Sequence, residues 1–259
     1  MTVPQIFDRH TRRRRRDRVA RSGFHDFEEH TTGLVLERLT MVTRRFDRAL
    51  VINTGFGMLA SALRGQRMDV TETDHGLQFA KAATTILCDE DDLPVAERTY
   101  DMVLAPAGFD TINDLPGALI AARRALKPDG LFMAILCGAP SLISLRAVLD
   151  ASNVGNTRAI SRIHPQIDVR AAGDLLQRTG FALPTADTET LRISYRSLGK
   201  LTDDIRASGA SNVLRHRFSM SRRELAQASD AFSALADSNG RVTETVTLIA
   251  MTGWAPPAL

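Results

Sequence analysis

Apolar residues change their spacing along this chain, from a helical period to an alternating or continuous one and back. Between residues 48 and 137, short apolar runs bounded by glycines or acids indicate strands, and amphipathic runs between them indicate helices. The expected strands lie at 48–53, 68–74, 84–92 (a strand that runs into an acidic turn), 99–106 and 130–137, and the expected helices at 57–65, 76–83 and 115–126. Strands that alternate with helices in this way predict an α/β fold with a doubly wound, mostly parallel sheet.

The two ends of the chain have a different pattern. Residues 1–47 are expected to form two helical segments, the second from about Phe27 to Arg45. After residue 140 we expect helices at 141–152 and 169–180, a strand at 185–195, a helical stretch from about Ser197 to Ala236, and a last strand at 241–254. We therefore predict one domain over 1–259, divided into a helical arm (1–47), a core (48–139) and a C-terminal half (140–259) with a helical insert at about 196–238.

The composition is that of a folded globular protein. Hydrophobic residues make up 44% and charged residues 24% of the 259 positions, which argues against wholesale disorder. Cys88 and Cys137 lie in apolar runs without metal-ligand spacing, so buried thiols in a reducing compartment are expected. No apolar run reaches the roughly 18 residues of a membrane span, and the N-terminus has no signal-peptide stretch.

A run of five arginines, Arg12 to Arg16, lies in the expected N-terminal helix from Asp8 to about Ser22. Such a run can bind nucleic acid or anionic lipid, or it can be the solvated face of a helix. Asp8 and Asp17 interrupt the charge, and no aromatic residue is placed to stack on bases. The sequence therefore favours a solvated face, and no nucleic-acid partner is expected.

Candidate functional residues lie where the expected strands end. In an open parallel sheet, ligands bind at the carboxyl ends of the strands. Glycines there let the backbone approach a ligand, and the N-terminus of the following helix faces it. The candidates are Asn53, Gly55 and Gly57 in the first turn, Asp74 after the second strand, Asp89 and Glu90 after the third, and Ala105, Asp110 and Thr111 in the loop after the fourth.

Several motifs occur in the order of one known superfamily: the glycine turn, the strand-end acid, "DEDDLP", "TYDMVLA" and "LKPDGLF". With them the chain resembles the class I S-adenosylmethionine-dependent methyltransferases, whose seven-stranded, Rossmann-like sheet it is expected to share. The arm "IFDRHTRRRRRDRVA" and the segments "DIRASGASN" and "MTGW" are more specific. They are similar to the branch of the mitochondrial complex I assembly factor described as an arginine hydroxylase, and the chain more distantly resembles the biotin-pathway malonyl-carrier-protein methyltransferase.

The resemblance implies S-adenosylmethionine as the cofactor and gives roles to the strand-end acids. Asp74 would bind the ribose, and Asp89 with Glu90 would bind the adenine edge. The turn that begins at Asn53 would lie under the methionine half of the cofactor. The resemblance names no catalytic residue.

Two features depart from the superfamily pattern. Val51 and Asn53 stand where an acid and the first glycine are usual, although asparagine can adopt the left-handed conformation that such a turn needs. Asp110 and Thr111 stand where a His-Trp pair is common. The methionine half of the site and the substrate loop are therefore altered, whereas the acids of the adenosine half are present.

The resemblance implies an enzyme that modifies a protein side chain, an arginine on the quinone-side iron–sulfur subunit of respiratory complex I, by methyl transfer or hydroxylation. Two alternatives are open: a non-catalytic complex I assembly scaffold with a degraded cofactor site, and a small-molecule or carrier-protein O-methyltransferase. The segment "HDFEEH" (25–30) has metal-compatible spacing but is interpreted as surface ion pairs, so no metal is expected. The expected location is the cytoplasm of a bacterium, near the inner face of the inner membrane, or the mitochondrial matrix of a eukaryote.

Overall fold

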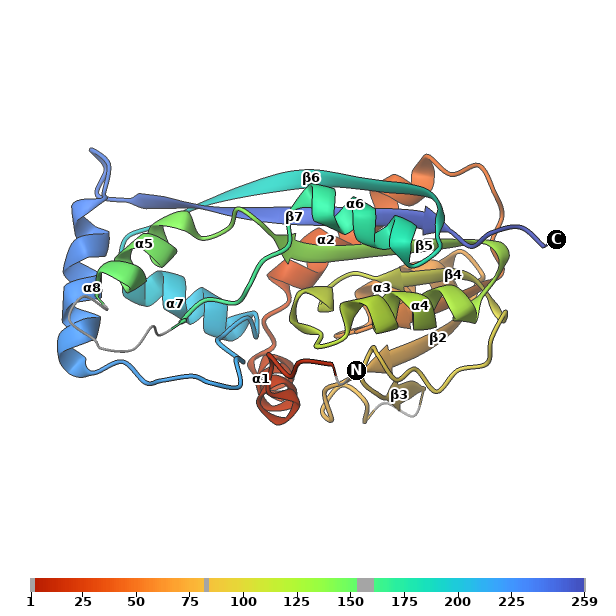
Figure 1. Ribbon diagram of the computed structural model, residues 1–259, viewed down its shortest axis with the longest axis horizontal. Coiled ribbons are helices and arrows are strands. Elements are labelled where there is room, and N and C mark those ends of the chain that lie inside the picture. Colours follow the sequence, from red (N-terminus) through yellow and green to blue (C-terminus); the bar gives the residue numbers. More distant parts are fainter. Residues whose placement is uncertain (1–2, 82–83, 153–160, 259) are drawn as a thin grey trace.

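One seven-stranded sheet forms the centre of the protein, with helices on both faces (Figure 1). The computed structural model describes residues 3–81, 84–152 and 161–258. The strands are β1 (Arg48–Ile52), β2 (Asp69–Asp74), β3 (Thr85–Leu87), β4 (Tyr100–Ala105), β5 (Leu126–Gly138), β6 (Ala182–Tyr195) and β7 (Val242–Trp254), in the order β3-β2-β1-β4-β5-β7-β6. The first five are parallel, and β7 runs antiparallel to both β5 and β6. The prediction of a doubly wound, mostly parallel sheet is confirmed.

Helices cover both faces of the sheet and continue beyond its carboxyl edge. They are α1 (Arg9–Ser22), α2 (Asp26–Thr40), α3 (Met58–Gly65), α4 (Leu115–Ala125), α5 (Ile143–Ala151), α6 (Val169–Arg178), α7 (Leu198–Ala207) and α8 (Arg222–Ala234), with a short 3₁₀ turn, η1, at Phe109–Thr111. Helices α4 and α6 pack on one face, and α2 and α3 on the other. Helices α5, α7 and α8 share a separate apolar cluster at the end where β5 leaves the sheet (Figure 1).

Strand β1 shows why the parallel strands are apolar without interruption. Leu50 and Ile52 belong to the core on the face of α4, while Ala49 and Val51 belong to the core on the face of α2 and α3. All four are essentially inaccessible to water. Because both faces of a parallel sheet are covered by helices, both sets of alternate side chains must be apolar. No helix in the described residues is long and apolar enough to cross a membrane.

The helix expected at 76–83 is absent from the described part of that segment, which forms turns up to residue 81. Side chains bond the amides that would begin a helix there. The carboxylate of Asp74 accepts from the Gly76 amide at 2.8 Å, and Asp17 of α1 accepts from the Gln78 amide at 2.8 Å. The helix prediction was wrong for residues 76–81, where these two side-chain contacts hold the turns instead.

Two other helix predictions have different limits in the structure. Helix α2 ends at Thr40 rather than near Arg45, because the chain must reverse direction to enter β1. The helical stretch expected over 197–236 is two helices, α7 and α8, separated by extended chain. That intervening chain contains Val213 and Leu214, which are buried against the N-terminal arm.

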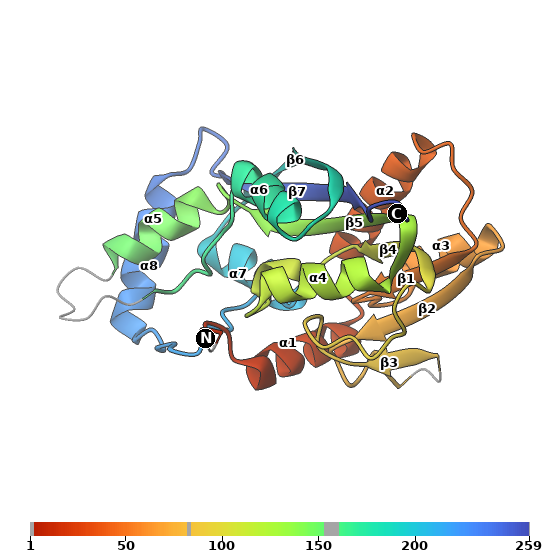
Figure 2. The same ribbon diagram turned by 45° about the vertical axis from the view of Figure 1, so that its right-hand side comes forward.

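The intervening chain fastens the start of α1. Phe7 and Leu214 form an antiparallel bridge, and the amide of Asp8 donates to the carbonyl of Val213 at 2.8 Å. Asp8 then caps α1 by accepting from the Thr11 amide at 3.1 Å. Figure 2 shows α1 lying along the edge of the molecule beside β3. The helix therefore begins at a fixed point relative to the carboxyl edge of the sheet.

His164 packs under this junction and should make the protein less stable in mild acid. Its Nε2 accepts from the Val213 amide at 2.9 Å, its ring lies edge-on to Phe7, and burial lowers its pKa from 6.5 to about 4. The folded state favours the neutral imidazole of His164. Its contribution to stability is therefore complete above pH 6.5 and is lost as the pH falls toward 4. We expect a loss of about 2 kcal/mol in the free energy of unfolding between pH ~7.5 and ~5, measured by urea denaturation.

The variant His164→Gln isolates this effect. Its amide oxygen can still accept from the Val213 amide, but it does not titrate over this range. The difference between the two unfolding free energies should therefore shrink as the pH is lowered. Parallel pH curves for the two proteins would show that His164 is not the source of the acid sensitivity.

Candidate functional site

The predicted site residues meet at the carboxyl edge of the sheet, as the strand order requires. Asp74 ends β2, and Asp89 and Glu90 follow β3. Asp110 and Thr111 lie in η1, directly after β4. Ala105 is an exception, because it is fully buried in the apolar core behind the edge. The strand ends therefore bring the acids together, while the side chain of Ala105 supports the edge from inside.

The first turn has the left-handed backbone predicted for it. Asn53, Gly55 and Gly57 have φ angles of 58°, 62° and 79°. The Asn53 side chain is buried and donates to the carbonyl of Ala107 at 3.1 Å, while its oxygen faces Nδ1 of His75 at 2.8 Å. Asparagine thus keeps the shape of a glycine turn, but its amide fills space that a glycine would leave open.

Glu28 of α2 occupies the position in front of the N-terminus of α3. Its carboxylate accepts from the amides of Phe56 at 2.9 Å and Met58 at 3.2 Å. A Cβ on Gly55 would lie 2.1 Å from the Glu28 carboxylate, so a larger residue there would displace Glu28 from its position, and the φ of 62° itself favours glycine. Burial raises the pKa of Glu28 despite the two amide donors. Glu28 therefore already satisfies the amides that would otherwise face an anionic group of a ligand.

Arg16 of α1 binds Asp74 with two N–H groups. Nη2 donates to Asp74 Oδ2 at 2.7 Å and Nε donates to Oδ1 at 3.2 Å. The same carboxylate accepts from the amides of Gly55 at 3.1 Å and Gly76 at 2.8 Å. Burial disfavours the charged carboxylate, yet Arg16 holds the pKa of Asp74 below its usual value. Both oxygens of the predicted ribose ligand are thus engaged by the protein itself.

Arg12 is the most buried cation of this edge and binds Glu90 through a bidentate pair. Nη1 and Nη2 donate to the two Glu90 oxygens at 2.7 and 2.6 Å, Nη2 also donates to the Gly108 carbonyl at 2.9 Å, and Nε donates to Thr111 Oγ1 at 2.9 Å. Burial opposes charge on both partners, but their attraction holds the pKa of Glu90 well below its usual value and raises the pKa of Arg12. These four contacts use four of the five N–H groups of the guanidinium, and we call the acceptors the Arg12 cradle.

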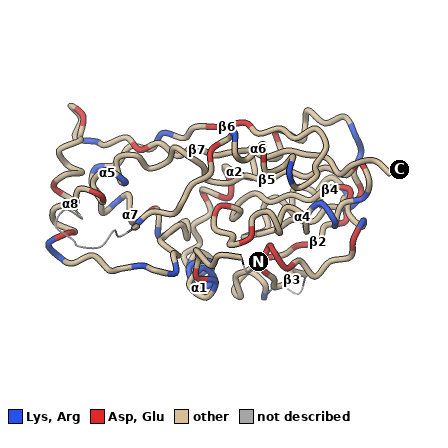
Figure 3. The backbone as a smooth tube through the Cα atoms, viewed as in Figure 1, with Lys and Arg blue, Asp and Glu red and all other residues tan. Residues whose placement is uncertain are grey.

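Arg9 and Arg13 of α1 also pair with acids at this edge of the sheet. Asp89 Oδ2 accepts from Arg9 at 2.9 Å and from Arg13 at 2.8 Å, and Arg9 also donates to Asp91 at 2.6 Å. Their side chains are 41% and 40% exposed, so these pairs are only partly shielded from water. We call Arg9, Arg12, Arg13 and Arg16 the arginine stripe; Figure 3 shows the concentration of basic residues on α1.

The prediction of a solvated arginine face was wrong for Arg12 and Arg16, whereas Arg9 and Arg13 remain partly exposed. The helix itself is present, with Asp8 as its cap, but Arg12 is only 7% exposed and the side chain of Arg16 only 16%. The spacing of the stripe was visible in the sequence, as was the set of acids at the strand ends. Their pairing was not, because a solvated face and a paired face have the same local pattern.

The surroundings of His75 and Asp110, at the carboxyl edge of the sheet, shift the pKa of both side chains. His75 lies between Asn53 and Glu90, with Nδ1 3.2 Å from Glu90 Oε1, and burial together with Arg12 lowers its pKa. Asp110 is partly buried, and the loss of hydration raises its pKa. His75 is therefore neutral near pH 7. The described residues contain no group of three or more His, Cys, Asp or Glu side chains that could hold a metal ion.

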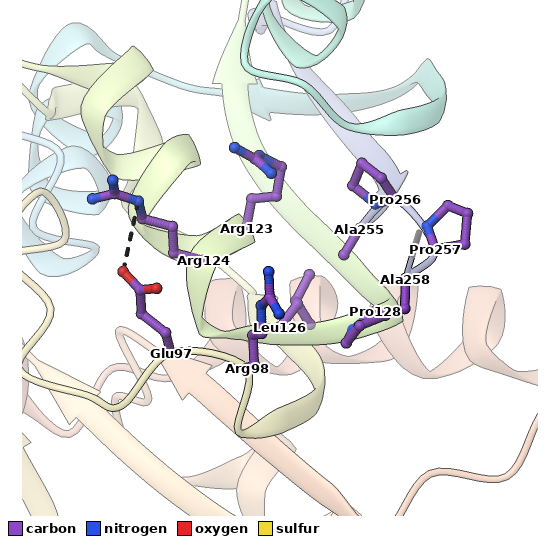
Figure 4. A pocket seen from close by; sticks show the side chains of 10 residues that line it. All are labelled: Glu97, Arg98, Arg123, Arg124, Leu126, Pro128, Ala255, Pro256, Pro257 and Ala258. Atoms are coloured by element: carbon purple, nitrogen blue, oxygen red, sulfur yellow. Dashed lines mark ion pairs between the residues drawn. The ribbon is translucent and has the colours of Figure 1, made fainter.

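A cavity of about 510 Å³ lies at the end of the sheet opposite to the carboxyl edge; Figure 4 shows the side chains that line it. It is bounded by the end of α4, the start of β5 and the C-terminal tail; the lining residues include Arg98, Arg123, Arg124, Pro128 and Pro256. None of the predicted site residues lines it. The size of this cavity therefore does not locate the candidate site, whereas the acidic and polar side chains place it at the carboxyl edge.

Comparison with known proteins gives the class of this site. Residues 32–134 match the model of a methyltransferase domain. The backbone is similar to that of the YcgJ protein from Bacillus subtilis, with a TM-score of 0.59 and 18% identity over 89% of this chain and 100% of that one. The domain match makes residues 32–134 a methyltransferase domain, a class of domain whose cofactor is S-adenosylmethionine. The similarity to YcgJ shows that the chain shares its fold.

Sequence similarity identifies a narrower group, and the predicted resemblance is confirmed. The chain is 30% identical to the mitochondrial arginine-hydroxylase NDUFAF5 of Danio rerio, over 97% of this chain and 83% of that protein, and it belongs to this family. It is also 26% identical to the malonyl-[acyl-carrier protein] O-methyltransferase of Xylella fastidiosa, over 90% of this chain and 81% of that protein. The similarity to both proteins extends well beyond the methyltransferase domain.

With α1 in place, the site does not fit S-adenosylmethionine. The acids are suitable acceptors for a nucleoside, but Asp74 and Glu90 are already bonded to Arg16 and Arg12. The cavity left between α1, α2 and the loop after β4 measures about 30 Å³. Pockets for small molecules have volumes of roughly 300–1,000 Å³. The functional groups agree with the cofactor of the superfamily, but the arginines of α1 occupy the acids that would bind it.

Proposed function

We propose that this protein is an S-adenosylmethionine-dependent enzyme that modifies a protein side chain, an arginine on a subunit of respiratory complex I during assembly. The similarity to an arginine hydroxylase supports this proposal, because it covers nearly the whole chain. It includes the arm and the C-terminal insert, which lie outside the matched methyltransferase domain. A protein that acts on complex I would work at the inner face of the membrane that holds the complex.

The observation that carries the proposal is the cradle around Arg12. Four N–H···O contacts hold this guanidinium, two of them to the carboxylate of Glu90 and the others to Gly108 and Thr111. Planar, bidentate pairing with a carboxylate is specific for arginine, and lysine cannot reproduce it. The acidic residue expected at the adenine edge therefore already holds a guanidinium group, that of the chain's own Arg12, so this edge is able to bind an arginine side chain.

A non-catalytic assembly scaffold is the second candidate. It is favoured by one observation, the engagement of Asp74 and Glu90 by α1 and the small cavity that remains. A protein that only grips a partner has no need of an open cofactor site. This candidate shares the complex I context with the first, so an experiment must separate assembly from modification.

Peptide mass spectrometry on complex I subunits from cells with and without this protein tests both candidates. The free subunits should be analysed together with the assembled complex, because assembly itself can fail in the deletion strain. We expect one arginine to lose a modification in the deletion strain and to regain it on complementation. The mass gained distinguishes methyl transfer from hydroxylation.

Complementation with Glu90→Gln tests the site, because this variant keeps the size of the side chain and removes the carboxylate expected at the adenine edge of the cofactor. Loss of the modification with assembly retained would support the enzyme. Restored assembly with no arginine modified by the wild-type protein would identify a scaffold. Identical modification in the presence and absence of the protein would exclude the proposed activity.

A further inference from the structure

We infer that the arginine stripe is an internal occupant of the nucleoside end of the cofactor site, so that α1 and S-adenosylmethionine compete for the same carboxylates. The inference rests on the proposed use of this cofactor. It concerns the regulation of the site, because the docked arm is then the closed state of the protein. Binding of the cofactor requires an open state in which α1 has left the acids.

The spacing of the stripe is the first argument. Arg9, Arg12, Arg13 and Arg16 follow an i, i+3, i+4, i+7 pattern, which places them on one face of a helix. That face meets Asp74 after β2 and the acidic turn after β3, the two segments expected to bind ribose and adenine. Arg14 and Arg18, on other faces of α1, are exposed to solvent.

The second argument is the number of acceptors already in use. Each oxygen of Asp74 receives one N–H of Arg16 and one backbone amide, and each oxygen of Glu90 receives one N–H of Arg12. A ribose or an adenine amine would have to take these places from the arginines. The Asp74 and Glu90 side chains are 0% and 2% exposed, so the approach of a ligand is blocked as well.

The third argument concerns the energetic balance between the two states. A buried ion pair is strongly offset by the loss of hydration of its charges, so docking of α1 need not be tight. The apparent dissociation constant of a ligand that binds only the open state equals its intrinsic value divided by the open fraction. Any substitution that weakens docking without touching the acids should therefore tighten cofactor binding.

Calorimetric titration with S-adenosylhomocysteine tests this inference on the full chain. Arg9→Ala/Arg13→Ala removes three partly exposed pairs, two to Asp89 and one to Asp91, with little risk to folding, and should bind about three- to tenfold more tightly than wild type. Arg12→Met should gain more than about tenfold. Arg14→Ala/Arg18→Ala removes the same charge from exposed positions of the same helix and should bind as wild type does.

Hydrogen exchange of α1 gives a second readout that does not depend on activity. Release of the helix predicts faster exchange of the amides of residues 9–22 when S-adenosylhomocysteine is added. Slower exchange there, or equal or weaker binding by both stripe variants, would overturn the inference while leaving cofactor use intact. Absence of binding by wild type and by all variants, even at millimolar ligand, would overturn both the inference and the proposed function.

Discussion

Replacing Arg12 with methionine is expected to lower the free energy of unfolding by about 3 kcal/mol, because the substitution leaves the Glu90 carboxylate buried without its cation. Methionine keeps most of the length of the side chain, so lost packing contributes little. Urea denaturation near neutral pH measures the change. Arg14→Met is the matched control, because Arg14 is exposed on the same helix, and it should change stability by less than about 0.5 kcal/mol.

The double variant Arg12→Met/Glu90→Gln measures how much of the lost stability comes from leaving one charge buried without its partner. With neither charge present, the desolvation cost disappears, so the double variant should be more stable than the sum of the two single losses implies. Strict additivity would mean that the two residues act independently, contrary to their 2.6 and 2.7 Å contacts.

The contribution of Glu90 to the free energy of unfolding should also depend on pH. The folded pKa of Glu90 is depressed, so its contribution is complete above about pH 4.5 and is lost as the pH falls below that value.

Asp74→Asn should lower the free energy of unfolding by a similar amount, about 3 kcal/mol. Its carboxylate accepts four N–H groups, two from Arg16 and the others from the amides of Gly55 and Gly76. An asparagine brings an NH₂ group toward donors and removes the carboxylate that pairs with Arg16. Hydrogen exchange should be faster at both glycine amides, which would show that Asp74 ties the first turn to the second strand end.

Asp69→Asn is a control on the same strand. Asp69 begins β2 and pairs with Arg48 at 3.0 Å, but the two side chains are 66% and 44% exposed. Exposed pairs contribute little, so this variant should stay within about 0.5 kcal/mol of wild type. Equal losses in Asp69→Asn and Asp74→Asn would show that β2 responds to any lost carboxylate, and would remove the special role of Asp74.

The sheet and the positions of its strand ends could be predicted from the sequence, because their causes are local. Uninterrupted apolar runs such as that of β1 have few alternatives to a doubly covered strand. The left-handed conformation of Asn53 was also predictable, since few residues other than glycine and asparagine adopt it. The acids Asp74, Asp89 and Glu90 therefore lie where the sequence indicated.

The contacts made across the chain were not predictable, and they determine the state of the site. Glu28 gave no signal, because an acid in the first turn of a helix is ordinary. His75 gave none either, since a single buried histidine has no periodic pattern. The turns after Asp74, where a helix was expected, are bonded by Asp17 of α1 at the Gln78 amide. In each case the partner lies many residues away in the sequence, so no local pattern reports the contact.

The fixed start of α1 makes the phase of the helix as important as its composition. Successive residues of a helix are rotated by about 100°. Since Phe7 is fastened to Leu214, one residue inserted between Phe7 and Asp8 would turn the whole arm by that angle. Asp8 would then stand where Arg9 now meets Asp89, and repulsion would replace an ion pair. In relatives whose arms differ by one residue at this point, the arginines of α1 should therefore no longer face the acids of the carboxyl edge, even with every arginine retained.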